Sequence, residues 1–394
     1  MKQLLCSLIL LLGAFSAAMA AWTNHSLSSG GQVRVYRTYV PPGYDPGRPA
    51  SLIVVLHGLG GTMYDADNVG ITQIADTANI ILISPQALDF NSPLGIVAGA
   101  WNSGIVVNVP GLGAVPVNGT VDDVGFIKAM MDTTQGSYRI DPARVYVCGA
   151  SMGGFMTQRL ACEAAGYFAA AASVMGTYAL ALPPCNPGKM IPIAHFHGTR
   201  DEVVSWNGDL LFGGSAFPVG LSVDALIARW VTLDGCNTTP LHEVWPDSNN
   251  DTLYAEHYSY SDAAGQSRVE LFKVNKGTHA WYTSANTNGD IDYASEIWKF
   301  FNKQYRSGAT GVDDLFRKQF SVSLYPNPAQ ETLHIDAAGQ FNNVQISDLY
   351  GRTVAAYTKP DIKAIDISGL RPGIYCIRLQ AAQGALGFAK FVKQ

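Results

Sequence analysis

The sequence has few charged residues and no excess of either sign. Asp, Glu, Lys and Arg make up 14% of its 394 residues, and the formal net charge is -5. This balance offers no basic face for nucleic acid or for an anionic membrane surface. Because 47% of the residues are hydrophobic, the composition also excludes a disordered chain. There is no internal repeat and no low-complexity tract, and the length suits two domains.

No apolar run after the first twenty residues is long enough to cross a bilayer. The N-terminus, "MKQLLCSLILLLGAFSAAMAAW", has one lysine before a short apolar core, and Ala18 and Ala20 form an A-x-A cleavage site. We therefore expect a signal peptide at residues 1–20. The mature protein is expected to have no integral membrane span and to be secreted or attached to the cell surface.

Cysteine is scarce as well. Export allows disulfides, but removal of the signal peptide leaves five cysteines, so at least one stays unpaired. Cys148 lies in an apolar strand, where we expect a buried free thiol. Cys162 and Cys185 flank one helix–strand unit and are the favoured pair, while the pairing of Cys236 and Cys376 stays open.

Continuous apolar segments alternate with helical ones over residues 21–306. The expected strands include "SLIVVLHG", "NIILISPQ", "RVYVCGA" and "IPIAHFHG", and the expected helices include "DDVGFIKAMMDTTQG" and "SVDALIARWVTLDGC". Apolar strands separated by helices predict a mostly parallel sheet with helices on both faces. The first domain is therefore expected to have an α/β fold.

The pattern changes after this domain. Residues 307–319, "SGATGVDDLFRKQ", have the composition of a linker. Residues 320–394 contain short alternating strands between turn residues and show no helical period. This pattern predicts a small all-β sandwich domain.

A serine lies at a strand-to-helix turn in the segment "GASMGG", which begins at Gly149. The segment fits G-x-S-x-G, in which a sharp, strained turn exposes a serine hydroxyl and glycines two positions away avoid collisions. We expect Ser151 to be a catalytic nucleophile. The N–H of Met152, at the start of the helix, is expected to stabilise a developing oxyanion.

A nucleophilic serine requires a base, and the base requires an orienting acid. Asp201 is the first aspartate after the strand "IPIAHFHG", and His279 follows the strand "VELFKVN". Their order, serine then acid then histidine, is that of an α/β-hydrolase. The alternatives to Asp201 are Asp209 and Asp224, which lie further from a strand end.

The strand "LIVVLHG" ends where the second oxyanion donor arises in such folds. We expect the N–H of Leu59 to provide this donor, and we interpret His57 as a structural histidine. Trp101, Trp206, Trp281 and Tyr282 lie on predicted loops near the expected site and are candidates for substrate contact.

Two segments raise the possibility of a metal. The pair His195 and His197 has no third ligand at a fitting spacing, so a structural role is favoured. Residues 286–292, "NTNGDID", partly match a calcium loop but lack its later glutamate. We expect Asp292 to cap a helix there, with calcium as an alternative. The overall expectation is that catalysis needs neither a metal nor an organic cofactor.

Residues 33–303 resemble the secreted esterases related to polyhydroxybutyrate depolymerases and to the feruloyl and acetylxylan esterases of carbohydrate esterase family 1. The matching segments are "LHGLGG", "WN", "DDVGFI", "DPARVYVCGASMGG", "FHGTRDEVVSW" and "GTHAWY". The resemblance implies an α/β-hydrolase fold, a triad of Ser151, Asp201 and His279, and a disulfide between Cys162 and Cys185. Many relatives carry leucine or another residue at the position of Ala150 and a glycine before the segment that contains His279, and neither difference specifies the substrate.

The C-terminal domain resembles the sorting domain of the type IX secretion system. The segments "LYPNPAQETLHI", "VQISDLYGRTV" and "DISGLRPGIYCIRL" carry this resemblance. It implies that the type IX machinery is a partner and exports the protein, with later cleavage or surface attachment. The alternative for this domain is a carbohydrate-binding β-sandwich.

These features predict a secreted serine carboxylic-ester hydrolase that forms an acyl-enzyme. The expected substrates are plant cell-wall feruloyl or acetyl esters. A polyester depolymerase is the main alternative. A serine peptidase of the prolyl oligopeptidase type would bring a propeller domain that is missing here, and a complete triad argues against a non-catalytic surface adhesin.

Overall fold

We describe the protein from a computed structural model, in which the chain divides into two compact units, residues 1–307 and 308–394. The predicted signal peptide and linker lie outside the described residues. No helix among the described residues is long and apolar enough to cross a membrane. The structure describes residues 21–93, 95–109, 111–248, 250–287, 289–306, 322–337, 341–348, 353–358, 362–381 and 386–394.

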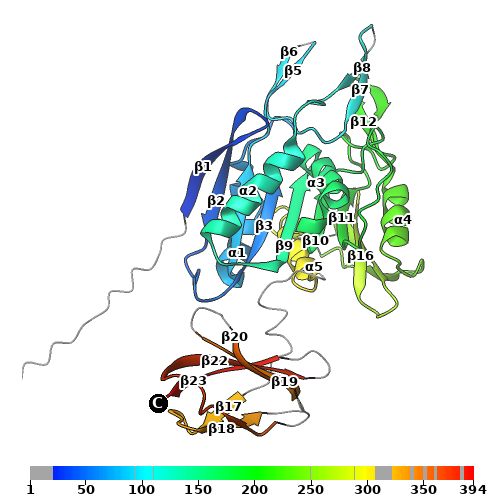
Figure 1. Cartoon of the computed structure of the whole chain (residues 1–394). Coiled ribbons are helices and arrows are strands. Elements are labelled where there is room, and N and C mark those ends of the chain that lie inside the picture. Colours follow the sequence, from blue (N-terminus) through cyan, green and yellow to red (C-terminus); the bar gives the residue numbers. More distant parts are fainter. Residues whose placement is uncertain are drawn as a thin grey trace, which may run out of the picture. The chain divides into compact units, whose positions relative to one another are not determined.

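The first unit is built around a ten-stranded sheet with the order β1-β2-β4-β3-β9-β10-β11-β16-β15-β14 (Figure 1). The six strands from β4 to β16 pair in parallel, and antiparallel strands flank them at both edges. The predicted mostly parallel sheet is confirmed. The strands are β1 (Ala21–Ser29), β2 (Gln32–Val40), β3 (Ala50–Leu56), β4 (Ile80–Pro85), β9 (Ile140–Ala150), β10 (Ala170–Val174), β11 (Ile193–Gly198), β14 (Leu241–Val244), β15 (Tyr254–Ser261) and β16 (Ser267–Asn275).

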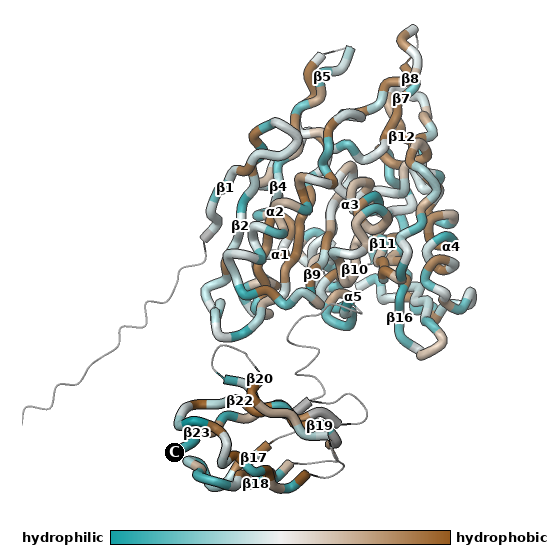
Figure 2. Tube along the Cα trace, in the orientation of Figure 1, coloured by the Kyte–Doolittle hydropathy of each residue, from teal (hydrophilic) through white to brown (hydrophobic). Residues whose placement is uncertain are grey.

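Helices cover both faces of the sheet, and alternation along the buried strands explains why. In β3, Leu52 and Val54 pack into one core while Ile53 and Val55 pack into the other. The central strands are accordingly the hydrophobic ones in Figure 2. Helices α2 (Asp123–Ser137), α3 (Met152–Glu163) and α4 (Val223–Leu233) border the first core. Helices α1 (Ile71–Ala78) and α5 (Tyr293–Phe301) border the second, and short 3-10 turns lie at Asp65–Asn68 and Ala165–Tyr167.

Three small hairpins extend beyond the sheet and were not predicted as separate elements. Their strands are β5 (Phe90–Ser92) with β6 (Gly95–Val97), β7 (Val106–Val109) with β8 (Gly113–Pro116), and β12 (Asp209–Phe212) with β13 (Ser215–Pro218). In Figure 1 the hairpins β5–β6 and β7–β8 project at the top of the first unit.

The second unit consists of two antiparallel sheets around one apolar core, which includes Leu333, Val344, Ile377 and Phe391. The predicted small all-β domain is confirmed. One sheet contains β17 (Val322–Tyr325), β18 (Thr332–Ala337) and β21 (Ala364–Asp366), and the other contains β20 (Thr353–Thr358), β19 (Phe341–Ser347), β22 (Gly373–Ala381) and β23 (Leu386–Lys393).

The predicted disulfide between Cys162 and Cys185 is present, with a Cα–Cα distance of 5.5 Å. Cys148 is a free, buried thiol in β9, and burial raises its pKa to about 12. Cys236 and Cys376 are free as well. The five cysteines after residue 20 therefore form one disulfide and leave three separate thiols.

Asp234, at the end of α4, gives the first unit a predictable pH response. Its Oδ1 accepts a hydrogen bond from Ile191 N at 3.0 Å, whereas its buried Oδ2 has no partner in the described structure. Burial raises the pKa of this carboxyl to about 7. The folded state therefore keeps the proton up to that pH, while the unfolded chain loses it near pH 4, so stability falls as pH rises between these values.

Replacing Asp234 with asparagine should remove this fall because the amide does not ionise. Between pH 5 and pH 8 the wild type should lose at least about 1 kcal/mol more of its free energy of unfolding than the variant. Its Tm should therefore drop further over this range. Thermal unfolding at both pH values checks this, with the exposed Asp132→Asn as a control for a lost surface charge. Equal drops in wild type and Asp234→Asn would contradict the prediction.

Candidate active site

Ser151 occupies a strained turn between β9 and α3. Its backbone has φ 55° and ψ -119°, values that a residue with a side chain rarely adopts. The turn is held by hydrogen bonds from Ser151 N to Val174 O at 2.8 Å and from Phe155 N to Ser151 O at 3.0 Å. The strand, the sharp turn and the helix expected around this serine are therefore all present.

The glycines of the turn allow β3, β9 and α3 to approach one another closely. A Cβ atom on Gly149 would collide with the Gly153 carbonyl, and one on Gly153 would collide with the Leu56 carbonyl. Both obstacles are backbone atoms that cannot move aside. No side chain can be accommodated at these two positions without displacing the turn that presents Ser151.

Asp201 and His279 form a hydrogen-bonded pair at the ends of neighbouring parallel strands. Asp201 follows β11 and His279 follows β16, and His279 Nδ1 lies 2.9 and 2.8 Å from the two Asp201 carboxylate oxygens. The Asp201 side chain is fully buried, and its Oδ1 also accepts from Val203 N at 2.9 Å and Val204 N at 2.8 Å. The carboxylate is therefore fixed from two sides before it meets the imidazole.

The alternative acids are engaged elsewhere. The Asp209 carboxylate accepts a hydrogen bond from Ser205 Oγ at 3.4 Å, and the Asp224 carboxylate accepts from Trp206 Nε1 at 3.2 Å. Neither makes a contact with His279 in the described structure. Of the three candidate acids, Asp201 is the one that contacts His279 in the described structure.

Ser151 and His279 line the same cavity, together with Leu59 and Met152. Ser151 Oγ makes no hydrogen bond to His279 among the described residues, and such contacts often tighten only when substrate binds. The backbone N–H groups of Met152 and Leu59 donate to no other described residue, so both are available to a substrate oxygen. Gly58 passes close by, since a Cβ atom on it would lie 3.4 Å from Ser151 Cβ.

His57 is a buried structural histidine. Its Nδ1 lies 2.7 Å from Gly58 O and its Nε2 accepts from Ala87 N at 3.0 Å, an arrangement that requires the neutral ring with the proton on Nδ1. Burial lowers its pKa, which also favours this neutral form. His57 therefore braces the loop that presents Leu59.

The expectation that Trp101 contacts a substrate is wrong. This side chain is fully buried, packs against the His57 ring and donates from Nε1 to His57 O at 2.8 Å. Tyr282 is buried as well, where its hydroxyl accepts from Thr278 N at 2.8 Å. The physical reason is the same for both, because each ring packs inward behind the loop that carries it.

Trp206 and Trp281 do not line the cavity either. Trp206 packs edge-on against His197, and Trp281 packs edge-on against Tyr293. All four aromatic residues therefore support the loops of the site, and none of them forms a wall of the cavity.

The walls of the cavity are mainly aliphatic. It has a volume of about 450 Å³, and the hairpins β5–β6 and β7–β8 contribute much of its surface. Its polar lining residues are Ser92, Ser151 and His279. Sequence reasoning missed these walls, although the alternating valines of "VVNVPGLGAVPV" were a readable signal. The aliphatic and aromatic lining residues include Phe90, Val97, Ile105, Val107, Val109, Val115, Val117, Phe155, Leu210 and Val219.

The His195 and His197 pair is part of the core. Both rings are fully buried, with His195 Nε2 at 3.2 Å from His197 Nδ1 and His197 Nε2 at 2.9 Å from Val204 O. Burial lowers the pKa of His195 well below its usual range. Asp292 caps α5 as predicted, accepting from Ser295 N at 2.9 Å.

Comparison with known proteins gives one family match for each unit. Residues 45–209 match the phospholipase/carboxylesterase family, and residues 323–394 match the secretion system C-terminal sorting domain. The resemblances that the sequence motifs indicated are therefore confirmed for both units.

The chain is also similar to individual esterases. Feruloyl esterase D of Neurospora crassa is 29% identical over 77% of this chain and 98% of that protein. Poly(3-hydroxyalkanoate) depolymerase C of Paucimonas lemoignei is 29% identical over 71% of this chain and 66% of that protein. Feruloyl esterase B of Piromyces equi is 26% identical over 61% of this chain, which spans only 41% of that protein.

Proposed function

We propose that this chain, a carboxylic ester hydrolase with a phospholipase/carboxylesterase-family domain and a C-terminal sorting domain, cleaves esters through Ser151, His279 and Asp201. The observation that carries the proposal is the hydrogen bond between His279 Nδ1 and the buried Asp201 carboxylate. The same imidazole and the strained Ser151 line one cavity. These are the roles of nucleophile, base and orienting acid on a fold that presents them at strand ends.

The reaction begins with attack of Ser151 Oγ on the ester carbonyl carbon, while His279 Nε2 takes the hydroxyl proton. The carbonyl oxygen becomes an oxyanion that the N–H groups of Met152 and Leu59 stabilise. The imidazolium then protonates the departing alkoxide, and an acyl-enzyme remains. A water molecule releases the acid by the same steps in reverse, and Asp201 balances the imidazolium charge throughout.

The proposed substrates are feruloyl or acetyl esters of plant cell-wall polysaccharides, with a polyester as the alternative. Relatives named feruloyl esterases and a poly(3-hydroxyalkanoate) depolymerase support the two choices. The aliphatic cavity beside Ser151 favours a large apolar acyl group over acetyl, since burying apolar area stabilises the bound acyl chain. Among the proposed substrates, a feruloyl ester is therefore preferred.

A substrate comparison tests this choice. Methyl ferulate should be cleaved with a higher kcat/KM than methyl acetate, by about tenfold or more. Val107→Asp should narrow this gap by placing a charge in the cavity wall, whereas the exposed Val33→Asp, outside the cavity, should not. Depolymerisation of polyhydroxybutyrate without cleavage of methyl ferulate would favour the polyester alternative.

The sorting domain supports export through the type IX secretion system to the cell surface or medium.

Deleting residues 307–394 should leave ester hydrolysis unchanged, because the triad and the ten-stranded sheet lie in the first unit, which has its own cores. The same deletion should retain the protein inside the native host. Assays of the purified truncated protein and of cell fractions check both parts. Loss of activity in a truncated protein that folds would show that the units are not independent.

A further inference from the structure

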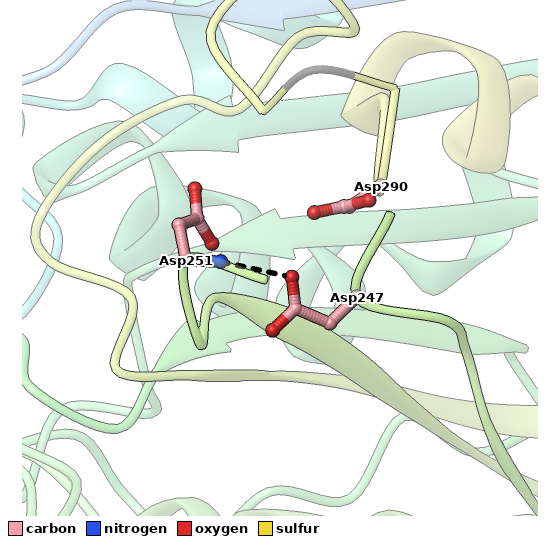
Figure 3. Close-up of side chains that lie close together, drawn as sticks. All are labelled: Asp247, Asp251 and Asp290. Carbon is pink, nitrogen blue, oxygen red and sulfur yellow. Dashed lines mark hydrogen bonds between the residues drawn. The ribbon is translucent and has the colours of Figure 1, made fainter. Parts of the chain in front are cut away.

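Three aspartates from two connections meet beside the second core, away from the cavity of Ser151. Asp247 and Asp251 lie between β14 and β15, and Asp290 lies just before α5. One carboxylate oxygen from each lies within 4.8 Å of those of the other two. Figure 3 shows the Asp290 carboxylate facing Asp247 and Asp251 across the gap between the two connections.

Asp290, a member of this cluster, has a buried carboxylate oxygen without a hydrogen-bond partner in the described structure. Only 6% of the residue is exposed, and its Oδ1 accepts from Ser248 N at 2.9 Å. Its Oδ2 is buried and has no hydrogen-bond partner in the described structure. A buried carboxylate oxygen without a partner is costly, so the site needs a group that the described residues do not supply.

The described lysines near the cluster do not supply the missing partner of Asp290. Lys299 lines the same surface pocket as Asp290, but its Nζ pairs with Glu296 at 2.7 Å. Lys276 Nζ donates to Thr252 Oγ1 at 2.6 Å. Neither Asp247 nor Asp290 forms an ion pair with a described lysine or arginine, so their negative charges are not balanced by such a pair.

The backbone holds Asp247 in a fixed position. Its two carboxylate oxygens accept from Asp251 N at 3.2 Å and from Thr252 N at 2.8 Å. Each carboxylate oxygen can accept more than one interaction, so these hydrogen bonds leave capacity for a cation. The two connections thus present a preformed set of hard oxygen ligands.

We propose that Asp247, Asp251 and Asp290 bind a divalent cation, and that this cation is Ca²⁺. Carboxylate oxygens suit Ca²⁺ and Mg²⁺, but opposite ligands lie about 5 Å apart around Ca²⁺ and only about 4 Å apart around Mg²⁺. The three carboxylate oxygens lie within 4.8 Å of one another, a bound that includes the wider spacing around Ca²⁺, whose coordination geometry is also the more flexible of the two. The adjoining pocket, with a volume of about 400 Å³, has room for the waters that complete six to eight ligands.

This ligand set differs from the one suggested by residues 286–292. Asn286 Oδ1 accepts from Thr283 N, and Asp292 caps α5, so both are used within their own segment. Of the described residues of that segment, Asp290 is the one that belongs to the aspartate cluster. The ligands from the β14–β15 connection could not be found by loop spacing, because they are about forty residues away in the chain.

The cation would stabilise the folded first unit and would take no part in ester hydrolysis. Asp290 belongs to the connection from β16 to α5, which also carries His279. A cation would tie this connection to the one between β14 and β15. None of the three aspartates lines the cavity of Ser151, so initial rates well below Tm should not change when the cation is removed.

The test uses the full chain after dialysis against EDTA. Ca²⁺ should raise Tm by about 3 °C or more at concentrations far above its Kd, and Mg²⁺ should raise it less. Tb³⁺, which replaces Ca²⁺, should luminesce on tryptophan excitation because Trp245 lines the same pocket as Asp290. Ca²⁺ should then quench this signal by competition.

The decisive variant is Asp290→Asn, with Asp132→Asn, an exposed aspartate on α2, as the matched control. Asp290→Asn should weaken Ca²⁺ binding at least tenfold while its metal-free Tm stays at or above the wild-type value, because carboxylate repulsion is relieved. If Asp290→Asn does not fold, Asp251→Asn is tested in its place. The proposal is overturned if Ca²⁺ up to about 10 mM changes neither Tm nor the Tb³⁺ signal. It is overturned equally if the variant responds like wild type.

Discussion

Replacing Ser151 with alanine should reduce ester hydrolysis by at least about a thousandfold. The change removes the nucleophile and leaves only the oxyanion donors and binding to act on an attacking water. Ser151 Oγ makes no hydrogen bond among the described residues, and its backbone would keep the same strained angles with alanine. The loss should therefore affect kcat while the fold is retained, with Tm within about 2 °C of the wild-type value.

The measurement is turnover of p-nitrophenyl acetate by the purified proteins, with circular dichroism and Tm as controls for folding. A fluorophosphonate probe should label wild type on Ser151 and fail to label the variant. Residual turnover above a few per cent of wild type would assign the nucleophile elsewhere. A wild-type protein without any esterase activity would instead revive the adhesin alternative.

The candidate triad could be predicted because each member follows a recognisable strand. Ser151, Asp201 and His279 come directly after apolar segments, and the carboxyl ends of parallel strands gather at one edge of a sheet. The sequence contains this information locally, in strand length and in the glycine-rich turn. The order of the strands is not local, so the positions of β1 and β2 beyond β4 could not be predicted.

The substrate contacts could not be predicted for a related reason. A tryptophan on a loop can face the solvent, a cavity or the interior, and only the tertiary packing decides. Trp101 is anchored to the His57 carbonyl and fully buried, although it follows no strand of the sheet. The walls come instead from Val107 and Val115, which pair across a short hairpin whose hydrophobic residues remain partly exposed. Such a hairpin has little core of its own, so its alternating valines indicate strands but not the cavity that these strands line.

Replacing Asp201 with asparagine should lower kcat about a thousandfold or more, because the fixed surroundings of this side chain impose the wrong histidine tautomer. Val203 N and Val204 N both donate to Oδ1, so the amide oxygen of asparagine must take that position. The amide NH₂ then faces His279 Nδ1, which must become an acceptor and move its proton to Nε2. An imidazole protonated on Nε2 cannot take the proton of Ser151.

Initial rates with p-nitrophenyl acetate measure this loss. The control is Asp209→Asn, which changes a carboxylate that is hydrogen-bonded to Ser205 and should keep a rate within about twofold of wild type. A similar loss in both variants, or none in Asp201→Asn, would contradict the role of Asp201 in holding the base.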